Sequence, residues 1–548
     1  MDRRKFLTGQ LAEEQTSSIV IPRTFSGLMP YSGVFGKNEL THLLKRTLFG
    51  VTQNDINLFK GKTLSEVIQT LLIAPPASSP PLNYYNDASS TDANVPTGQT
   101  WVTAPYGDGT INSRRVNSFK SWWTGRVLSQ NASLYEKMVL FWHNHFATET
   151  GDISDARFIY KHHQVIRTFA FGNFRQFIKQ ITIDPSMLRY LNGYLNTKTA
   201  PDENYGRELQ ELFTLGKGPG SKYNEDDVKA ASKVLTGYRI DANTISYSFD
   251  PTRHDTGNKT FSAFYNNKVI TGKIGAAGAT ELDDMLDMIF LQSEVSMYIC
   301  RRLYRFFVYY NIDSATEANV IAPLAEIFKN NNFEIKPVLQ ALFSSEHFFD
   351  VLNRGCLIKS PIDLLAGLSR EFEVIFPDST DGINQYYMWE YIRAQASILQ
   401  QNLGDPPNVA GWPAYYQQPQ FHELWINSDT LPKRIQFTDR MISTGYTRNG
   451  KKIIIDPIAY VNKLSKPDDP NLLIKDVLDQ LYSSPVSQQL KDFLKSILLS
   501  GQSLDYYWTE AWQNHKNNPA NVMARSIVNT RLVSFFKYVM NLSEYQLS

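Results

Sequence analysis

The 548-residue sequence contains very little cysteine, with Cys300 and Cys356 as its only two. Two cysteines cannot build a disulfide framework, and neither has another Cys or a His at the spacing of a metal site. We therefore expect both to be thiols packed in the core.

The sequence also lacks an excess of either charge. Its 55 Lys and Arg residues nearly balance its 54 Asp and Glu residues, which leaves a formal net charge of +1. Because non-specific binding of a polynucleotide depends on many cations that displace counterions, this balance provides no such field. We expect no nucleic-acid partner.

Long apolar runs are missing as well. Hydrophobic residues make up 42% of the chain and the mean hydropathy is −0.33, as in an ordinary globular protein. A bilayer-spanning helix needs about 20 mostly apolar residues, and no such stretch is present. We therefore predict no transmembrane segment.

The amino terminus has one of the two features of a twin-arginine export signal. Asp2 to Leu7 has the pattern of a twin-arginine signal, with Arg3 and Arg4 followed by Lys5 and Phe6. Such a signal continues into an apolar stretch, whereas residues 9–15 are polar and include two glutamates. A cytoplasmic location is the default interpretation. Twin-arginine export, a charged frayed terminus and a signal that has lost its apolar part are the alternatives.

Most of the chain has the apolar periodicity of amphipathic helices, so we predict a mainly α, multi-helical globular protein. Residues 75–113 are rich in Pro, Ser, Asp, Asn and Gly and indicate a long inserted surface loop. Residues 239–274 are rich in turn formers and favour minor β structure. We divide the chain into a tail at 1–37, a helical domain at 38–440 that contains the inserted loop, and a C-terminal helical extension at 441–548 that packs on it.

Several strings, taken in order, are specific as a set. They include the runs 42–50 (HLLKRTLFG), 141–146 (FWHNHF), 203–216 (ENYGRELQELFTLG), 359–361 (KSP) and 407–413 (PNVAGWP). Together they resemble the bacterial family called domain of unknown function 1800, over roughly residues 38–440. A modest departure is Tyr238, where the family usually has Trp. The resemblance implies a mostly helical protein without an established reaction, often encoded beside a sulfatase-like protein.

The run 203–216 contains a carboxylate in an unusual position. If residues 203–215 form one helix, with about 100° per residue, Glu208 falls inside the apolar sector. Gln210 faces away, and Glu211 lies at the edge. Since an isolated buried charge costs several kcal/mol, Glu208 must be protonated, paired or bound to a metal. Either it forms a structural ion pair with an arginine such as Arg167, Arg175 or Arg189, or it is a functional carboxylate.

The run 141–146 contains two histidines that a helix places on different faces. His145 faces the core and His143 the polar side, so they share a ligand only if the backbone leaves the helix between them. A buried neutral His145, hydrogen-bonded to a carboxylate or carbonyl group, is the alternative.

These strings contain the candidate site residues. We predict Glu208, His145 and Glu211 as catalytic residues of an acid/base or metal-dependent enzyme. The cofactor is unknown, but a divalent metal takes such nitrogen and oxygen ligands. The predicted ligands are His143, His145, Glu203, Glu208, His254 and Asp255.

Three functions follow from these observations. The leading hypothesis, based on the resemblance, is a helical scaffold or accessory factor that acts with a protein partner such as the sulfatase-like neighbour. The second is the metal-dependent or acid/base enzyme. The third is glycan binding through aromatic residues near loops, since exposed rings stack on sugars; anchoring of the loops to the core is the alternative for these rings. They are Trp122, Trp123, Trp412, Tyr415, Tyr416 and Trp425.

Overall fold

The structure is a computed structural model that describes residues 23–416 and 421–548, so the twin-arginine-like start lies outside the described residues. Helices account for 57% of it and strands for 6%, which confirms the mainly α-helical prediction. Among the described residues, no helix combines the length and the apolar character that a bilayer span requires.

The first half of the chain is a succession of helices of 4–20 residues. They are α2 (Lys37–Thr47), α3 (Gln53–Phe59), α4 (Leu64–Leu71), α5 (Gly109–Leu128), α6 (Tyr135–His145), α7 (Thr150–Ile153), α8 (Ala156–Phe169), α9 (Phe174–Thr182), α10 (Pro185–Tyr190), α11 (Asn204–Glu208) and α12 (Glu225–Val234).

The second half contains the remaining α-helices of the described chain. They are α13 (Glu281–Phe290), α14 (Ser293–Phe307), α15 (Ser314–Thr316), α16 (Ala322–Asn330), α17 (Ile335–Phe343), α18 (Glu346–Phe349), α19 (Pro361–Glu371), α20 (Gly382–Ile398), α21 (Pro413–Tyr416), α22 (Thr430–Ser443), α23 (Pro457–Val461), α24 (Pro470–Leu481), α25 (Gln488–Leu498), α26 (Tyr506–Asn517) and α27 (Val522–Asn541).

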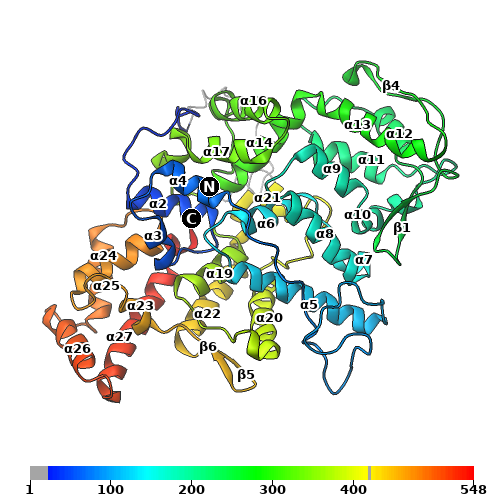
Figure 1. Cartoon of the computed structure of the whole chain (residues 1–548). Helices are drawn as coiled ribbons and strands as arrows, with labels where there is room; N and C mark the ends of the chain where they lie inside the picture. Colours follow the sequence, from blue (N-terminus) through cyan, green and yellow to red (C-terminus); the bar gives the residue numbers. More distant parts are fainter. Residues whose placement is uncertain (1–22, 417–420) are drawn as a thin grey trace, which may run out of the picture.

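The strands form small antiparallel pairs. Two pairs fall in the segment predicted to have β structure: β1 (Tyr238–Asp241) with β2 (Ser246–Phe249), and β3 (Lys259–Thr260) with β4 (Val269–Ile270). A further pair, β5 (Tyr446–Arg448) with β6 (Lys451–Ile453), was not expected from the sequence. These hairpins lie at the edge of the helical body (Figure 1).

Local capping sets several helix boundaries. Thr52 accepts a hydrogen bond from the Asp55 backbone N–H, and Asp55 accepts one from the Thr52 N–H, which forms a capping box at the start of α3. Gly50 precedes it with a φ of +74°, and a Cβ there would lie 2.5 Å from the Gly367 carbonyl oxygen. A glycine is therefore required where α2 turns away against α19.

The loop predicted at 75–113 is shorter than expected and partly internal. Helix α5 begins at Gly109, where Asp108 caps it. Within the loop Trp101 is fully buried, and Asp92 forms a buried ion pair of 2.6 Å with Arg115. The loop therefore contributes to the core instead of lying wholly on the surface.

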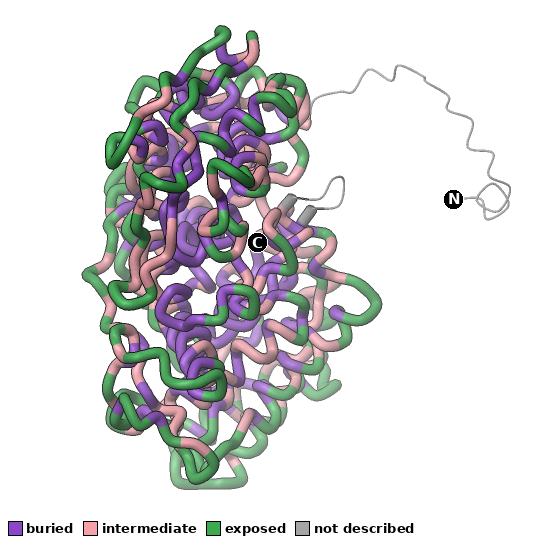
Figure 2. The backbone as a smooth tube through the Cα atoms, turned by 90° about the vertical axis from the view of Figure 1, so that its right-hand side faces the viewer, coloured by how far each residue is buried: buried purple, intermediate pink, exposed green. Residues whose placement is uncertain are grey.

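The chain end returns to the middle of the molecule. Helix α27 packs against α22, α23, α25 and α26. Leu547 then forms a β-bridge with Ile358, close to the start of α19. Figure 2 shows buried segments along the whole length of the molecule, and the carboxyl end of the chain lies beside its central part.

Candidate anion-binding site

A cavity is lined by residues of α2, α6, α14 and α19. Figure 1 shows where these helices lie in the molecule. About 50 Å³ of the cavity is open to the centres of water molecules. Because one water needs about 10–15 Å³ measured in this way, the cavity has room for a few waters or one small polyatomic group. We call it the cationic cavity, for the lining residues Lys45, Arg46, Lys137, Arg302 and Arg305; Asn144, Ser360, Asp363, His422 and Ser548 are among its other polar lining residues.

The charges that line this cavity are strongly unbalanced. Among the described residues that line it, five side chains are Lys or Arg, whereas Asp363 is the one carboxylate side chain. Lys137 of α6 forms an ion pair with Asp363. Lys45 and Arg302 make no ion pair with any residue in the described ranges. An anion inside the cavity would therefore be attracted from several sides.

Arg46 shows the imbalance most directly. Its side chain is only 3% exposed at the end of α2. Its Nη2 donates to the Asn353 carbonyl oxygen at 2.8 Å and to Cys356 Sγ at 3.1 Å, but Nε and Nη1 have no hydrogen-bond partner in the described part of the chain. Buried donors are nearly always paired, so these two N–H groups call for an acceptor. Of the predicted core thiols, Cys300 is buried and Cys356 is half-buried.

Lys45 precedes Arg46 and is also buried. Within the described residues its Nζ has no hydrogen-bond partner. Burial, reinforced by the charge of Lys359, lowers the pKa of Lys45 to about 7. Burial therefore destabilises its charged ammonium form, and a nearby anion would stabilise that form.

Two arginines come from successive turns of α14. Arg302 donates to the Tyr298 hydroxyl at 3.2 Å. Burial, followed by the neighbouring guanidinium groups of Arg302 and Arg301, lowers the pKa of Arg305 to about 10. Arginine normally keeps its proton far above this pH, and the lowered pKa of Arg305 reflects its burial first and the neighbouring like charges second.

Aromatic rings form another part of the cavity wall. Phe306 and Tyr415 have ring centroids 5.4 Å apart, and Tyr415 lies 5.4 Å from Trp425. Burial and the charge of Arg46 lower the pKa of His422 to about 4, so this ring is neutral at pH 7. The aromatic wall lowers the local polarity and so strengthens the field of the cations.

The loop that carries this wall is fixed to α6 by Asn144. The Trp412 backbone N–H donates to Asn144 Oδ1 at 2.8 Å. Gly411 has a φ of +92°, and a Cβ there would lie 2.3 Å from the same oxygen. Trp412 is 1% exposed, in agreement with the expectation that it anchors the loop.

The predicted catalytic His145 is a buried ring next to the core, not a group facing the cationic cavity. Its Nε2 donates to the Phe213 carbonyl oxygen at 3.1 Å, and burial holds its pKa well below the usual value. This is the neutral, hydrogen-bonded state given above as the alternative. His143 packs 4.8 Å from the Trp123 ring, and burial lowers its pKa to about 3.

The predicted carboxylates lie at a break in their helix. Helix α11 ends at Glu208, and Leu209–Thr214 is a π-helix. The wider turn changes the direction of the side chains, so Gln210, expected to face away, is fully buried and accepts a hydrogen bond from Tyr265 at 2.7 Å. The prediction of one uninterrupted α-helix over 203–215 was wrong for this reason.

Glu208 itself is half-buried, and its Oε2 has no hydrogen-bond partner within the described ranges. Burial and the charge of Glu211 raise the pKa of Glu208. Of the arginines considered as partners, Arg167 pairs with Glu136, and Arg175 pairs with Asp287. Glu211 forms an ion pair with Lys217, and Glu203 lies 3.3 Å from Arg207.

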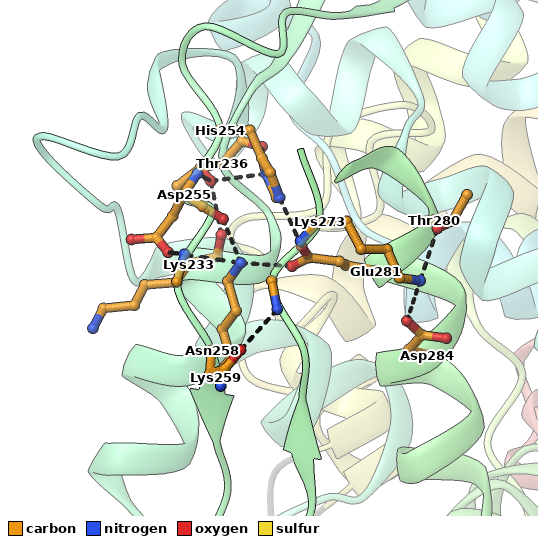
Figure 3. A network of polar contacts seen from close by, with 12 residues as sticks. Lys233, Thr236, His254, Asp255, Asn258, Lys259, Lys273, Thr280, Glu281 and Asp284 are labelled. Carbon is orange, nitrogen blue, oxygen red and sulfur yellow. Dashed lines mark hydrogen bonds and ion pairs between the residues drawn. The ribbon is translucent and has the colours of Figure 1, made fainter. Parts of the chain in front are cut away.

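His254 belongs to a separate buried network, shown in Figure 3. Its Nε2 lies 3.1 Å from Glu281 Oε1, and its Nδ1 lies 2.9 Å from the Thr236 carbonyl oxygen. Lys259 Nζ lies 2.6 Å from the other Glu281 oxygen. Asp255 donates its backbone N–H to Thr236 Oγ1 at 2.8 Å. The network ties the 254–273 segment to α13.

The structure therefore distributes the predicted ligands over three places: α6, the start of the π-helix region and the His254 network. In residues 23–416 and 421–548 no group of three or more His, Cys, Asp or Glu side chains is arranged to hold a metal ion. The predicted metal and acid/base site stays a prediction.

Sequence reasoning missed the cationic cavity, although one signal was present. Lys45 and Arg46 interrupt an apolar run that reads Leu43, Leu44, then Leu48 and Phe49. Two adjacent cations in such a run must be buried or must break the helix. The other members come from α6 and α14, and only the fold brings them together.

The fold and the cavity define a multi-helical protein with a buried, positively charged site. A family model described as "Protein of unknown function (DUF1800)" matches residues 42–547, nearly the whole chain. The chain belongs to this family, which confirms the resemblance; the matched range also runs through residues 441–547. No curated protein and no solved structure matches it.

Proposed function

We propose that this chain binds an oxyanion, in the form of a phosphate, sulfate or carboxylate group, in the cationic cavity. The proposal rests on Arg46, a buried guanidinium with two nitrogen atoms that have no hydrogen-bond partner in the described part of the chain. The described residues that line its cavity include five Lys or Arg side chains and one carboxylate side chain. Planar guanidinium groups bind such anions through paired N–H donors. The small volume favours a single anionic group over a whole drug-sized molecule.

Calorimetric titration with phosphate and with sulfate tests the proposal. At constant ionic strength set with chloride, we expect a Kd of about 1 mM or lower for at least one of them, equivalent to about 4 kcal/mol. Arg302→Gln removes one half-buried cation from the lining and should weaken binding about tenfold, since a hydrogen bond to a charged group contributes about 1.5–3 kcal/mol.

The matched control is Arg301→Gln. Arg301 is the preceding residue of α14, but it pairs with Glu294 and Glu317 and does not line the cavity. We expect this variant to keep the wild-type Kd. Equal loss of binding in both variants, or no binding by the wild type, would contradict the proposal.

An accessory role beside a sulfatase-like protein stays a second proposal. It is supported by the resemblance, and a cavity for an oxyanion suits a protein that works where sulfate groups are handled. Co-purification with that neighbour in stoichiometric amount is the expected result. Recovery of this chain alone would count against the role.

The enzyme hypothesis is supported by one observation, the half-buried Glu208 carboxylate, whose Oε2 has no hydrogen-bond partner among residues 23–416 and 421–548. Metal analysis of the purified protein distinguishes a metal-dependent enzyme from one that works by acid/base catalysis alone. The glycan hypothesis has less support, because Trp122, Trp123, Trp412 and Trp425 are all at most 3% exposed. Buried rings anchor loops and offer no face to a sugar.

A further inference from the structure

A second and larger cavity lies between α3 and α24, which are side by side in Figure 1. About 550 Å³ of it is open to the centres of water molecules, so it lies within the range of about 300–1,000 Å³ of ligand sites. We call it the α3–α24 groove. It shares no lining residue with the cationic cavity.

Apolar side chains form the walls of the groove. Leu40, Ile56 and Phe59 are buried wall residues, and Phe35 and Leu464 are half-buried at its sides. The capped start of α3 and the turn after α23 bring these residues together. Such walls favour one large apolar group of a ligand.

Lysines surround the groove. Lys37, Lys60, Lys62 and Lys463 line it, whereas Asp476 is the one carboxylate side chain among the described lining residues. Asp476 accepts hydrogen bonds from the Ser465 backbone N–H and hydroxyl, and Lys463 pairs with Glu373. Lys37 and Lys60 are exposed and form no ion pair with a described residue. The rim therefore attracts negative charge.

Gln480 of α24 supplies an independent observation. Its side chain is 3% exposed and lines the groove, yet its amide forms no hydrogen bond with any residue in the described ranges. A side-chain amide has two donors and one acceptor oxygen, and those of Gln480 are available to a ligand in the groove. A peptide bond offers both the acceptor and the donor that this amide lacks.

We propose that the α3–α24 groove binds an acidic peptide segment of a partner protein. One large apolar side chain of the segment occupies the apolar walls, its backbone pairs with Gln480, and its carboxylates lie against Lys37 and Lys60. Complementary charge selects the partner and speeds its association, while the apolar contact supplies affinity.

The experiment uses the full chain and a fluorescein-labelled peptide, acetyl-Glu-Glu-Leu-Phe-Glu-Glu-amide, followed by fluorescence anisotropy. We expect a Kd on the order of 100 μM, or about 5 kcal/mol. Replacement of the four glutamates by lysines, or of Leu-Phe by Gly-Gly, should abolish binding at this concentration.

Variants of the chain locate the binding. Lys37→Glu combined with Lys60→Glu should raise the Kd at least tenfold. Gln480→Leu keeps the volume and removes the amide, so it should keep the fold and raise the Kd several-fold. Lys268→Glu is the matched control, because Lys268 is exposed beside β4, at the far end of the molecule from α24 in Figure 1, and should leave the Kd unchanged.

Three results would overturn the proposal. They are equal binding of the acidic and the lysine-substituted peptide, an unchanged Kd in both groove variants, and binding of decanoate in the groove without binding of the peptide. Phosphate binding in the cationic cavity is measured separately, so the two proposals fail independently.

Discussion

At the scale of single residues, Lys45 and Glu208 stand out because each is kept in a state that its surroundings do not favour. Lys45 is buried without a hydrogen-bond partner within the described residues, and its pKa is lowered to about 7. Glu208 is half-buried beside Glu211, and its pKa is raised. Such groups reduce stability and are retained at functional sites more often than elsewhere.

Lys45 predicts a pH dependence. Its folded pKa of about 7 lies below its ordinary value of 10.5, so between these pH values the unfolded chain holds more protons and stability rises with pH. An anion in the cavity favours the ammonium form. At pH 8.5 we therefore expect binding of phosphate to take up protons.

Titrations of phosphate at pH 8.5 in buffers of different ionisation enthalpy measure this uptake. The observed enthalpy should change with the buffer for the wild type and much less for Lys45→Met, which keeps the volume without the charge. The same enthalpy in every buffer for the wild type would show that Lys45 does not respond to the anion.

Glu208 predicts a gain of stability on neutralisation. Its raised pKa means that the folded chain holds more protons than the unfolded chain above pH 4.5, so ionisation at pH 7 disfavours folding. Glu208→Gln should therefore raise the melting temperature at pH 7. Glu203→Gln is the control, because Glu203 has Arg207 as a partner and gains nothing by neutralisation. A lower melting temperature for Glu208→Gln would mean that Glu208 has a stabilising partner.

At the scale of elements, the buried network of Figure 3 connects the 254–273 segment to α13. Glu281 is fully buried and accepts contacts from His254, Lys259 and the Lys273 backbone N–H at 2.6–3.1 Å. Removal of its charge takes away the nearer counter-ion of the buried Lys259 and leaves Asp255, at 3.6 Å, as its remaining carboxylate partner. Breaking a buried pair in this way typically costs about 3–5 kcal/mol.

We therefore expect Glu281→Gln to lower the free energy of unfolding by about 3 kcal/mol, measured by denaturant titration followed by circular dichroism. Glu326→Gln on α16 makes the same chemical change at an exposed position and should leave stability within about 0.5 kcal/mol. If both variants unfold at the same denaturant concentration as the wild type, the network does not hold this segment.

Elements also show how far the sequence could predict the fold. The amphipathic period is local, so the helices, the cap at Thr52 and the β segment near 239–274 could be predicted from neighbouring residues. The π-helix at Leu209–Thr214 could not, because its apolar spacing also fits an α-helix. The predicted direction of the Gln210 side chain was wrong for that reason. Glu208, which was predicted to be buried, is half-buried.

At the scale of the whole molecule, the cationic cavity joins segments that are far apart in the sequence. Lys45, Lys137 and Arg302 come from α2, α6 and α14, and the chain end lies beside them. In the sequence, each of these three residues looks like an ordinary charged residue on the surface of a helix. Only long-range packing brings them together. The predicted metal and acid/base site combined His145 and Glu208 because each is an unusual residue in its own segment. In the structure His145 is hydrogen-bonded in the core, whereas Glu208 lies at the end of α11 beside Glu211.

The most direct measurement is the position of the anion itself. In crystals grown with selenate, a sulfate analogue that anomalous scattering locates, we predict a selenium peak in the cationic cavity, within hydrogen-bond distance of the Arg46 guanidinium. A cavity that contains only water at a saturating selenate concentration would contradict it.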